Sequence, residues 1–524
     1  MRESVDWPTA DLLTHRRETT PDKTAVIDTE TDRRWSYREF DCRVDRVSNA
    51  LESIIKAQAT SNSDGPPRVG VLMETRPAFA SLVFAAMRTG CVLVPLNVRE
   101  TATEIESKIE RTDLEAVICE RETEPLAVSS TARPVFSVDE PSDSGSKSVR
   151  VRPLPADSGE AMTAPEPTVL DRDDPFLILF TSGTSGEPKG VRLTVGNLVS
   201  SATASAFRLG VLPTDRWLCC LPMYHMGGLA PAVRSVLYGT SLVIQREFEP
   251  EATARVLAEY DISGVSLVPT MLKRLLEAGW SEPDSLRFVL LGGAPASSEL
   301  LERAREADVP AFPTYGMTET ASQISTATPE QSRAHDGTVG QPLAVTDVTI
   351  ADEDGEPVSR GETGEIVVSG PTVTPGYLED EHTAKAFDEH GLHTGDIGYR
   401  DRDGRLWVLN RRSDRIVTGG ENVDPGEVAD VIRAHSAVEE IAVVGLSDPE
   451  WGERVGTLVV PSGSAKNMSA GDLLGFCDGQ LAGFKQPKTI GFTDSLPRTS
   501  SGTVDRDAVR DLLRDGGIDA AALE

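Results

Sequence analysis

The sequence predicts an α/β protein. Its expected parts are a large N-terminal domain with mostly parallel sheets flanked by helices, a small β-rich subdomain, and a small α+β C-terminal domain. Three observations support this prediction. Apolar strand-like segments alternate with helix-like segments along most of the chain, an order typical of a parallel sheet covered by helices. After about residue 345 the pattern shifts to short β segments and turns, and after about residue 412 a mixed α/β region of roughly 110 residues begins.

The clearest alternation lies in the N-terminal part of the chain. Short apolar runs indicate strands, and apolar residues three or four positions apart indicate helices. The run from 69 to 96 has the order strand, helix, strand. Its two strands should be parallel, because a crossover helix returns the chain to the end at which the first strand began. The expected order is strand 24–27, strand 34–37, helix 39–55, strand 69–73, helix 77–89, strand 91–96, helix 101–111 and strand 115–119.

One segment in the middle of the chain breaks the alternation. Residues 121–172 are rich in Ser, Pro, Asp and Glu and contain few apolar residues, which predicts a long, loosely ordered surface excursion. Beyond this segment the alternation resumes with four apolar strands. They are expected at 176–180, 242–244, 265–268 and 288–291.

The charge balance excludes one class of partner. The chain has 83 acidic and 52 basic residues, a formal net charge of -31, and the acidic residues are spread along it. Such a surface repels phosphates, so no nucleic-acid partner is expected. Only 10 of the basic residues are lysines. Diffuse acid with scarce lysine resembles proteins of salt-loving (halophilic) organisms, in which salt screens the repulsion, so folding should weaken in low-salt buffer.

Neither a membrane span nor a signal peptide is expected. The most apolar early stretch, 78–95, is interrupted by Arg88 and Thr89, and no run has the roughly 18 apolar residues of a spanning helix. The N-terminus lacks the basic and then apolar pattern of a signal peptide. The six cysteines lack metal-site spacing and should be reduced thiols. These observations predict a cytoplasmic protein, and the sequence gives no prediction of oligomeric state.

A glycine- and hydroxyl-rich segment follows the expected strand at 176–180. Residues 181–191 have the sequence TSGTSGEPKGV. Three glycines let backbone N–H groups turn toward an anion, the hydroxyls offer more donors, and Lys189 supplies a positive charge. This chemistry suits a polyphosphate, although the spacing is not that of a Walker loop. A flexible polar loop is the alternative interpretation of the same composition.

The string at 181–190 resembles the phosphate loop of the acyl-adenylate-forming superfamily, which includes acyl-CoA synthetases, nonribosomal peptide adenylation domains and luciferases. Three further motifs of that superfamily follow in order and extend the resemblance over nearly the whole chain. They are YGMTE at 315–319, TGD at 394–396, and NRRSDRI at 410–416, in which Asn410 stands where the family has glycine. With four motifs in register, the chain is identified as a member of this superfamily.

The resemblance implies a mobile small domain and a set of cofactors. The small domain would swing about Ser413 and Asp414 and bring a loop with Gly419 and Gly420 to the site, where coenzyme A reacts. ATP, Mg²⁺ and coenzyme A are expected, with a small carboxylic acid as the substrate. The expected ranges are 1–410 for the N-terminal adenylate-forming (AMP-binding) domain, 411–414 for the hinge and 415–524 for the mobile C-terminal domain.

The same resemblance implies roles for individual residues. Tyr315 would stack on adenine, Asp396 would accept from the ribose hydroxyls, and Arg411 would contact ribose or phosphate. Glu319 and Thr184 would ligate Mg²⁺, because a hard cation prefers oxygen ligands. Catalytic roles would fall to His225, Glu319, Lys189 and Arg411. The expected nucleotide site comprises Thr181, Ser182, Gly183, Thr184, Gly186, Lys189, Gly293, Ala294, Pro295, Tyr315, Gly316, Met317, Thr318, Glu319, Asp396 and Arg411.

One position departs from the family pattern. The family has a lysine near its C-terminus, within Pro-Arg-Thr-x-Ser-Gly-Lys, that bridges the acid carboxylate and the α-phosphate. Here Thr503 takes its place and supplies no positive charge, so adenylation should be slowed on the order of 10²–10³-fold. Either Lys485 or Lys488 could reach the site, or Lys189, Arg411 and Mg²⁺ could suffice. A protein that binds nucleotide without efficient adenylation is the third account, and a working enzyme is favoured because the other motifs are present.

Residues near the expected acid pocket indicate the substrate. Segments at 266–272, 291–295 and 316–323 resemble the o-succinylbenzoate–CoA ligases of menaquinone biosynthesis. This resemblance implies a dicarboxylate whose succinyl carboxylate is activated, while its benzoate carboxylate needs a basic anchor, for which Arg234 is the candidate. A structural histidine and a solvated helix arginine are the alternatives for His225 and Arg234. The expected acid-binding residues are His225, Arg234, Ser266 and Ser322.

Two other functions stay open on the sequence alone. A fatty, aryl or short-chain acyl-CoA synthetase would use an acid without a second charge, which would leave Arg234 without a role in the pocket. A non-catalytic protein that binds nucleotide or acyl-adenylate would account for Thr503. A panel of acids tests the first alternative, and detection of a CoA thioester tests the second.

Overall fold

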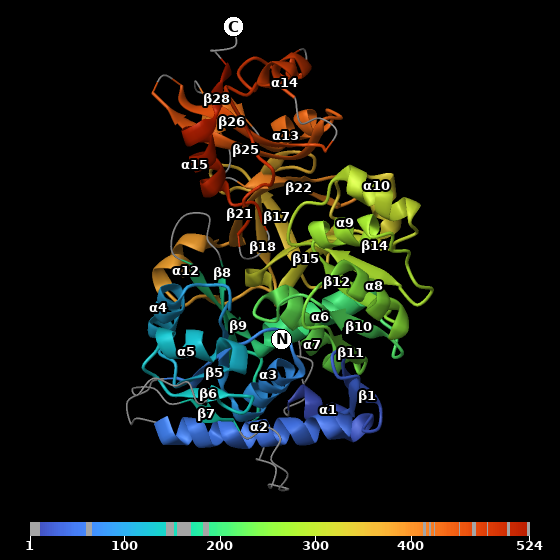
Figure 1. Ribbon diagram of the computed structural model, residues 1–524, viewed down its shortest axis with the longest axis vertical. Coiled ribbons are helices and arrows are strands. Elements are labelled where there is room, and N and C mark those ends of the chain that lie inside the picture. The colour runs from blue at the N-terminus through green and yellow to red at the C-terminus, as the bar shows by residue number, and fades with distance from the viewer. Residues whose placement is uncertain are drawn as a thin grey trace. The chain divides into compact units, whose positions relative to one another are not determined.

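The computed structural model divides into two compact units, and Figure 1 colours them along the chain. The first unit contains residues 1–349, 367–392 and 401–406, and the second contains 350–366, 393–400 and 407–524. None of the helices in the described part of the chain is long and apolar enough to cross a membrane. The structure describes residues 11–58, 65–142, 151–154, 169–181, 188–411, 416–418, 421–423, 425–449, 451–463, 468–478, 480–499 and 503–520.

The first sheet of the first unit has nine strands in the order β16-β15-β14-β13-β12-β10-β11-β1-β2. Its six central strands, from β14 to β1, are parallel, and β2, β15 and β16 are antiparallel to their neighbours. The expected parallel sheet is therefore confirmed here. The strands are β1 (Thr24–Asp28), β2 (Arg33–Ser36), β10 (Arg216–Cys219), β11 (Ser241–Ile244), β12 (Gly264–Leu267), β13 (Phe288–Leu291), β14 (Ala311–Met317), β15 (Ser322–Thr326) and β16 (Gln341–Pro342).

The second sheet has eight strands in the order β19-β9-β8-β4-β3-β5-β6-β7. The run from β8 to β7 is parallel, and β9 and β19 continue it in antiparallel fashion. The βαβ unit predicted between 69 and 96 is confirmed as β3, α3 (Pro77–Thr89) and β4. The strands are β3 (Arg68–Leu72), β4 (Val92–Pro95), β5 (Ala116–Cys119), β6 (Val135–Ser137), β7 (Arg152–Pro153), β8 (Pro175–Thr181), β9 (Lys189–Thr194) and β19 (Gly376–Tyr377).

The surface excursion predicted for 121–172 is wrong for its first part. Residues 121–123 form the 3₁₀ turn η1, Glu124–Ser130 form α5, and β6 adds to the sheet beside β5. Val135 and Phe136 are buried. Pairing with β5 decides the structure of this short, polar segment, and tertiary pairing of this kind leaves little periodicity in the sequence. Residues 143–150 and 155–168 of the excursion lie outside the described residues.

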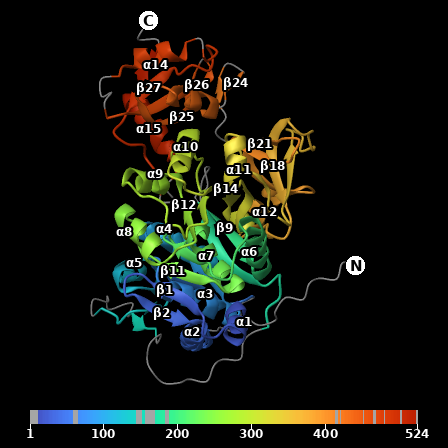
Figure 2. The ribbon, with the colours of Figure 1, turned by 90° about the vertical axis from the view of Figure 1, so that its right-hand side faces the viewer.

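Helices connect the two sheets of the first unit. One hydrophobic cluster combines residues of α2, α3, α6 and α7 with apolar residues of both sheets, for example Leu93 in β4 and Leu242 in β11. On the other face of the first sheet, α8, α9 and α10 follow one another (Figure 2). Helix α4 packs with α5 against the second sheet. The helices are α1 (Leu12–Thr19), α2 (Tyr37–Gln58), α4 (Ala102–Thr112), α6 (Val195–Leu209), α7 (Met226–Tyr238), α8 (Pro250–Glu259), α9 (Pro269–Glu277) and α10 (Ser298–Glu306).

The chain after residue 345 is rich in short strands, as predicted. A five-stranded sheet has the order β17-β18-β21-β20, with β22 beside β21. Four of its strands have residues in both units. The strands are β17 (Asp347–Ala351), β18 (Thr363–Ser369), β20 (Phe387–Asp388), β21 (Gly391–Arg400) and β22 (Leu406–Arg411), and the nearby short helices are η2 (Thr318–Thr320), α11 (Pro329–Ala334) and α12 (Asp380–Ala386).

The C-terminal part of the second unit has a mixed α/β fold with its own core. Val428 and Val455 lie in one apolar cluster, and Val509 and Leu513 of α15 lie in another. This confirms the small α+β part, while its predicted start at 415 stays a prediction. The elements are β23 (Ile416–Thr418), β24 (Glu421–Val423), α13 (Pro425–Arg433), β25 (Val438–Asp448), β26 (Gly452–Pro461), α14 (Ala470–Cys477), β27 (Thr489–Phe492), α15 (Arg506–Gly516) and β28 (Ile518–Asp519).

Candidate active site

Three neighbouring parallel strands of the first sheet, β12, β13 and β14, end at one edge and carry predicted site residues there. Ser266 of β12 is opposite Leu290 of β13, and Leu291 of β13 is opposite Pro313 of β14. The glycine-rich segment after β13 is therefore placed between the end of β12 and Tyr315. The carboxyl edge of a parallel sheet is where open α/β folds bind ligands, since the loops there are free to vary. The structure thus brings Ser266, Gly293 and Tyr315 to one edge of the sheet.

The glycines after β13 let the chain pass close to β14. A side chain at Gly292 would place its Cβ 2.7 Å from Cγ2 of Thr314, a distance that real Cβ atoms do not show. Gly293 has a φ of +79°, a left-handed conformation that glycine adopts without a steric cost. Gly293 and Pro295 are exposed and Ala294 is half-buried. The segment thus presents its backbone at the sheet edge, as a nucleotide-binding turn requires.

The turn between β14 and β15 is tight and strained. A Cβ at Gly316 would lie 1.7 Å from the carbonyl oxygen of Ser322, so only glycine fits. Met317 pairs with Ser322, and η2 begins at Thr318. Ala321 and Ser322 have φ values of +50° and +120°, which side-chain-bearing residues rarely adopt and which cost on the order of 1–3 kcal/mol each. Such strain is common at functional sites, and here it lies at Ser322, whose hydroxyl accepts a hydrogen bond from Arg234.

Glu319 lies beside the buried Tyr377, and the half-buried Lys189 lies near the same tyrosine. Glu319 is 6% exposed, and its Oε1 accepts a hydrogen bond of 3.0 Å from the Tyr377 hydroxyl. Burial, together with the charge and hydrogen bond of Glu319, raises the pKa of Tyr377 far above its ordinary value, so the hydroxyl remains a donor. Nζ of Lys189 is 5.2 Å from the centroid of the Tyr377 ring. A buried carboxylate fits a hard divalent cation such as Mg²⁺, which takes oxygen ligands.

The β8–β9 hairpin holds the two ends of the predicted phosphate loop. Thr181 pairs with Lys189 across the hairpin, and both residues are half-buried. The predicted residues between them, Ser182, Gly183, Thr184 and Gly186, lie outside the described residues. Tyr377 of β19 pairs with Val191 of β9, so the strand that carries Lys189 lies next to the strand that carries the tyrosine beside Glu319. Sequence reasoning missed Tyr377, because a lone tyrosine after glycine has no pattern that distinguishes it from a core residue.

His225 ends the loop after β10 and precedes α7. Thr75 holds this loop: its hydroxyl donates to the carbonyl of Leu221 and accepts from the N–H of Met223, both at 3.0 Å. Nε2 of His225 is buried and has no hydrogen-bond partner among the described residues. Burial, and then the nearby charges of Lys108 and Arg99, lower the pKa of His225 to about 4. The imidazole is therefore neutral near pH 7.

Arg234 is buried at 2% exposure on α7, so the solvated helix charge is the wrong interpretation. Its Nη2 donates to Oε1 of Gln323 at 2.9 Å and to Oγ of Ser322 at 3.2 Å, and the guanidinium lies 5.4 Å from the Trp217 ring centroid. Burial lowers the pKa of Arg234. No carboxylate in the described part of the chain pairs with it. A buried cation with only neutral partners is energetically costly, and an anionic ligand beside Arg234 would offset that cost.

Asp396 and Arg411 pair in the second unit. Nε of Arg411 lies 3.1 Å from Oδ1 of Asp396, whose side chain is buried while that of Arg411 is exposed. A carboxylate held in this way is an acceptor for hydroxyl donors, as the ribose role needs. The predicted hinge and CoA residues Ser413, Asp414, Gly419 and Gly420 lie outside the described residues.

The region around Thr503 has no lysine in the position that the family uses. Oγ1 of Thr503 lies 2.7 Å from Oγ1 of Thr499, and the N–H of Thr499 donates to the Thr503 carbonyl. Nζ of Lys485 lies 2.7 Å from both carboxylate oxygens of Glu427, and Lys488 is exposed. The Lys485–Glu427 pair is partly exposed and such pairs contribute little, so replacement of the family lysine by Lys485 or Lys488 stays a prediction.

Two family models match the chain. The model described as AMP-binding enzyme matches residues 13–378, and the model of the AMP-binding enzyme C-terminal domain matches residues 427–503. Among curated relatives, the 2-succinylbenzoate--CoA ligase of Bacillus pumilus is 36% identical over 97% of both chains. The 2-succinylbenzoate--CoA ligase of Listeria innocua is 43% identical over 64% of this chain and 69% of its own.

Solved structures agree with these relatives. The o-succinylbenzoate CoA synthetase (MenE) of Bacillus subtilis, in complex with the acyl-adenylate intermediate OSB-AMP, has a TM-score of 0.85 at 33% identity, covering 97% of this chain and 99% of its own. The same protein in complex with ATP and magnesium ion has a TM-score of 0.84 at 32% identity, with the same coverage. MatB from Rhodopseudomonas palustris, bound to ATP, has a TM-score of 0.85 at 28% identity.

Proposed function

The chain belongs to the AMP-binding enzyme family, and from that premise we propose that it activates 2-succinylbenzoate with ATP and passes the acyl group to coenzyme A. Its reaction type is that of an AMP-forming acid–CoA ligase that works through an acyl-adenylate. The observation that carries the choice of acid is Arg234, a buried cation with neutral partners in the described part of the chain. The relatives that act on this acid match along most of the chain.

The reaction has two steps. An oxygen of the acid carboxylate attacks the α-phosphorus of ATP, and pyrophosphate leaves. The thiolate of coenzyme A then attacks the acyl carbon, and AMP leaves with the oxygen that it shared with the acid. Mg²⁺ supplies positive charge to the phosphate oxygens when it is bound. On the protein side, Lys189 adds a cation, Glu319 offers a buried carboxylate oxygen, and a neutral His225 can lie against the reacting carboxylate without a salt bridge that would stabilise the ground state.

Arg234 explains why the acid should carry a second carboxylate. A benzoate carboxylate beside the guanidinium would form paired, charge-assisted hydrogen bonds and would restore charge balance in a buried site. Ser322, which already contacts Arg234, can donate its hydroxyl to the same carboxylate. A monocarboxylic fatty or aryl acid offers no such partner. We therefore include Arg234 and Ser322 in the acid pocket, with Ser266 and His225 as its other polar residues.

The test compares two acids that differ only in the ring carboxylate. Wild-type enzyme should prefer 2-succinylbenzoate over 4-oxo-4-phenylbutanoate, as measured by pyrophosphate release in molar salt. Arg234→Ala should lower kcat/KM for the diacid roughly 30- to 700-fold, which corresponds to a loss of about 2–4 kcal/mol of transition-state stabilisation. The kcat/KM for the monoacid should change little. Arg305→Ala, at an exposed arginine of α10, is the matched control. Equal use of both acids by the wild type would exclude the dicarboxylate and favour the alternative acyl-CoA synthetases.

Thr503→Lys tests the remaining alternative, a protein that binds nucleotide without catalysis. A lysine there restores the charge that the family uses, so pyrophosphate exchange should rise on the order of 10²-fold if the first step limits the rate. Wild-type protein should still yield 2-succinylbenzoyl-CoA, detected by mass. Binding of ATP without thioester in either protein would mean that the chain is a sensor.

The setting in which the enzyme works is also part of the proposal. A net charge of -31 supports activity at high salt, where counter-ions screen the repulsion. The melting temperature should rise with added KCl toward molar concentration, and a melting temperature indifferent to salt would contradict this. Because ATP and coenzyme A are intracellular metabolites, we place the reaction in the cytoplasm, as a step of menaquinone biosynthesis.

A further inference from the structure

A buried carboxylate lies next to the Thr394-Gly395-Asp396 turn and has no role so far. Glu365, in β18, is 7% exposed. Its Oε1 accepts from the N–H of Gly395 at 3.0 Å, and its Oε2 lies 3.1 Å from Nδ1 of His393. The two oxygens of Glu365 thus contact two residues of β21, His393 and Gly395. Glu365 therefore holds the chain on both sides of Thr394, directly before Asp396.

The neighbouring bonds fix the same turn. The hydroxyl of Thr394 donates to the carbonyl of Ile366 at 2.7 Å, and the N–H of Asp396 donates to that hydroxyl at 3.1 Å. Gly395 has a φ of +74°, a left-handed residue within strand β21, as in bulges that redirect a side chain. Three successive residues of β21 are thus tied to Glu365 and Ile366 of β18. All of these residues belong to the second unit.

This geometry separates two tasks. Asp396 pairs with Arg411 and offers carboxylate oxygens, while Glu365 holds the backbone from which Asp396 projects. We propose that Glu365 is a positioning residue that orients Asp396 for the ribose hydroxyls of ATP. The proposal rests on the ribose role of Asp396 given above. A misplacement of about 1 Å at a group that positions a ligand can lower its effect on the order of 10²-fold. Loss of Glu365 should therefore weaken the interaction between Asp396 and the ribose hydroxyls.

The test uses nucleotides with and without ribose hydroxyls. ATP and 2′,3′-dideoxy-ATP are titrated against wild type, Glu365→Ala and Glu365→Gln, so that no acid is needed and the identity of the acid does not affect the result. Glu365→Ala should weaken ATP binding about 10- to 100-fold and leave dideoxy-ATP binding within about twofold of wild type. Glu365→Gln keeps the size of the side chain and one acceptor oxygen, so its affinity for ATP should lie between those of wild type and Glu365→Ala. Glu362→Gln, at an exposed residue of the same segment, is the matched control.

A double-mutant cycle with Asp396→Ala completes the test. If Glu365 acts through Asp396, adding Glu365→Ala to Asp396→Ala should weaken ATP binding no further. Equal losses for ATP and dideoxy-ATP, or losses that add in the double variant, would overturn the proposal and leave Glu365 a purely structural role. Wild-type protein that binds both nucleotides equally would overturn it as well. An inactive enzyme that still discriminates between the nucleotides would instead refute the proposed reaction and support the role of Glu365.

Discussion

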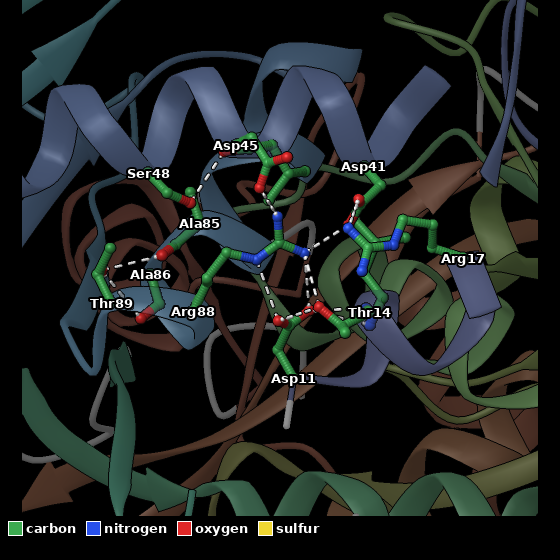
Figure 3. Close-up of polar contacts among 12 residues, drawn as sticks. Asp11, Thr14, Arg17, Asp41, Asp45, Ser48, Ala85, Ala86, Arg88 and Thr89 are labelled. Atoms are coloured by element: carbon green, nitrogen blue, oxygen red, sulfur yellow. Dashed lines mark hydrogen bonds and ion pairs between the residues drawn. The ribbon is translucent and has the colours of Figure 1, made fainter. Parts of the chain in front are cut away.

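Two arginines of the first unit are equally buried, at 2% exposure, and have opposite surroundings. Arg88, near the end of α3, lies among three carboxylates (Figure 3). Its Nε is 3.0 Å from Asp11, its Nη2 is 2.6 Å from Asp41, and its Nη1 contacts Asp45. Arg234, on α7, has the neutral acceptors Ser322 and Gln323.

The pKa shifts follow from this difference. Burial by itself lowers the pKa of both guanidinium groups, since a charge is harder to hold away from water. At Arg88 the hydrogen bonds and charges of Asp11 and Asp41 outweigh burial and raise the pKa above its ordinary value. At Arg234 burial dominates, and the pKa is lowered. The protein thus neutralises Arg88 with its own carboxylates, whereas in the described part of the chain Arg234 has only neutral partners. This is the difference expected between a structural arginine and the acid-binding role proposed for Arg234.

Replacing each arginine by an uncharged residue tests this difference with the largest expected effect. Arg88→Met should lower the free energy of unfolding by about 3–5 kcal/mol, because the buried Asp11 and Asp41 and the half-buried Asp45 lose their shared partner. Arg234→Met leaves only two neutral acceptors unpaired and should cost at most about 1–3 kcal/mol. Urea unfolding followed by tryptophan fluorescence measures both, with Arg305→Met as the exposed control. Equal losses for the two buried sites would show that Arg234 is as structural as Arg88.

A ligand should distinguish the two sites as well. At 100 times its Kd, 2-succinylbenzoate should stabilise the wild type by about 2.7 kcal/mol, since it binds only the folded protein. Arg88→Met should be less stable but gain the same increment, whereas Arg234→Met should gain little. Unfolding midpoints with increasing acid, without ATP, measure this. An unchanged increment in Arg234→Met would remove this arginine from the acid pocket.

Local pattern was enough to predict most of the fold. The helix expected at 77–89 is α3, because Pro77 begins it and the left-handed Gly90 ends it, and both signals are local. The surface excursion predicted over 121–142 is wrong, because β6 depends on pairing with β5. Val135 and Phe136 are too few apolar residues to give a periodic pattern. A local sequence pattern does not show which segments of the chain pair with one another.

The same limit applies to the sites. The sequence identified Arg88 only as a charge that interrupts an apolar stretch, because its partners lie up to 77 residues away in the chain. It identified Glu319 by its motif but not Tyr377, which lies 58 residues further on. Motif residues could be predicted because they are contiguous. Residues that hold them, such as Tyr377, required the folded chain.

The smallest expected effect is a pH dependence within the Arg88 cluster. Asp45 faces Arg88, Asp41 and Arg17, and burial, with the charge of Asp41, raises its pKa above the ordinary value despite Arg88. A carboxyl with a raised folded pKa binds more protons in the folded protein than in the unfolded chain. Its contribution to stability therefore falls as pH rises from about 4 toward that raised pKa.

Asp45→Asn removes this titration, so the stability of the wild type relative to the variant should fall as pH rises through that window and level off above it. Urea midpoints of the two proteins at a series of pH values measure the difference, with Asp22→Asn, at an exposed carboxylate paired with Arg38, as the control. A wild-type advantage that grows with pH would mean that Arg88 outweighs burial at Asp45. In that case Arg88 would stabilise the ionised form of Asp45, as in an ordinary salt bridge, and the contrast with Arg234 would be sharper still.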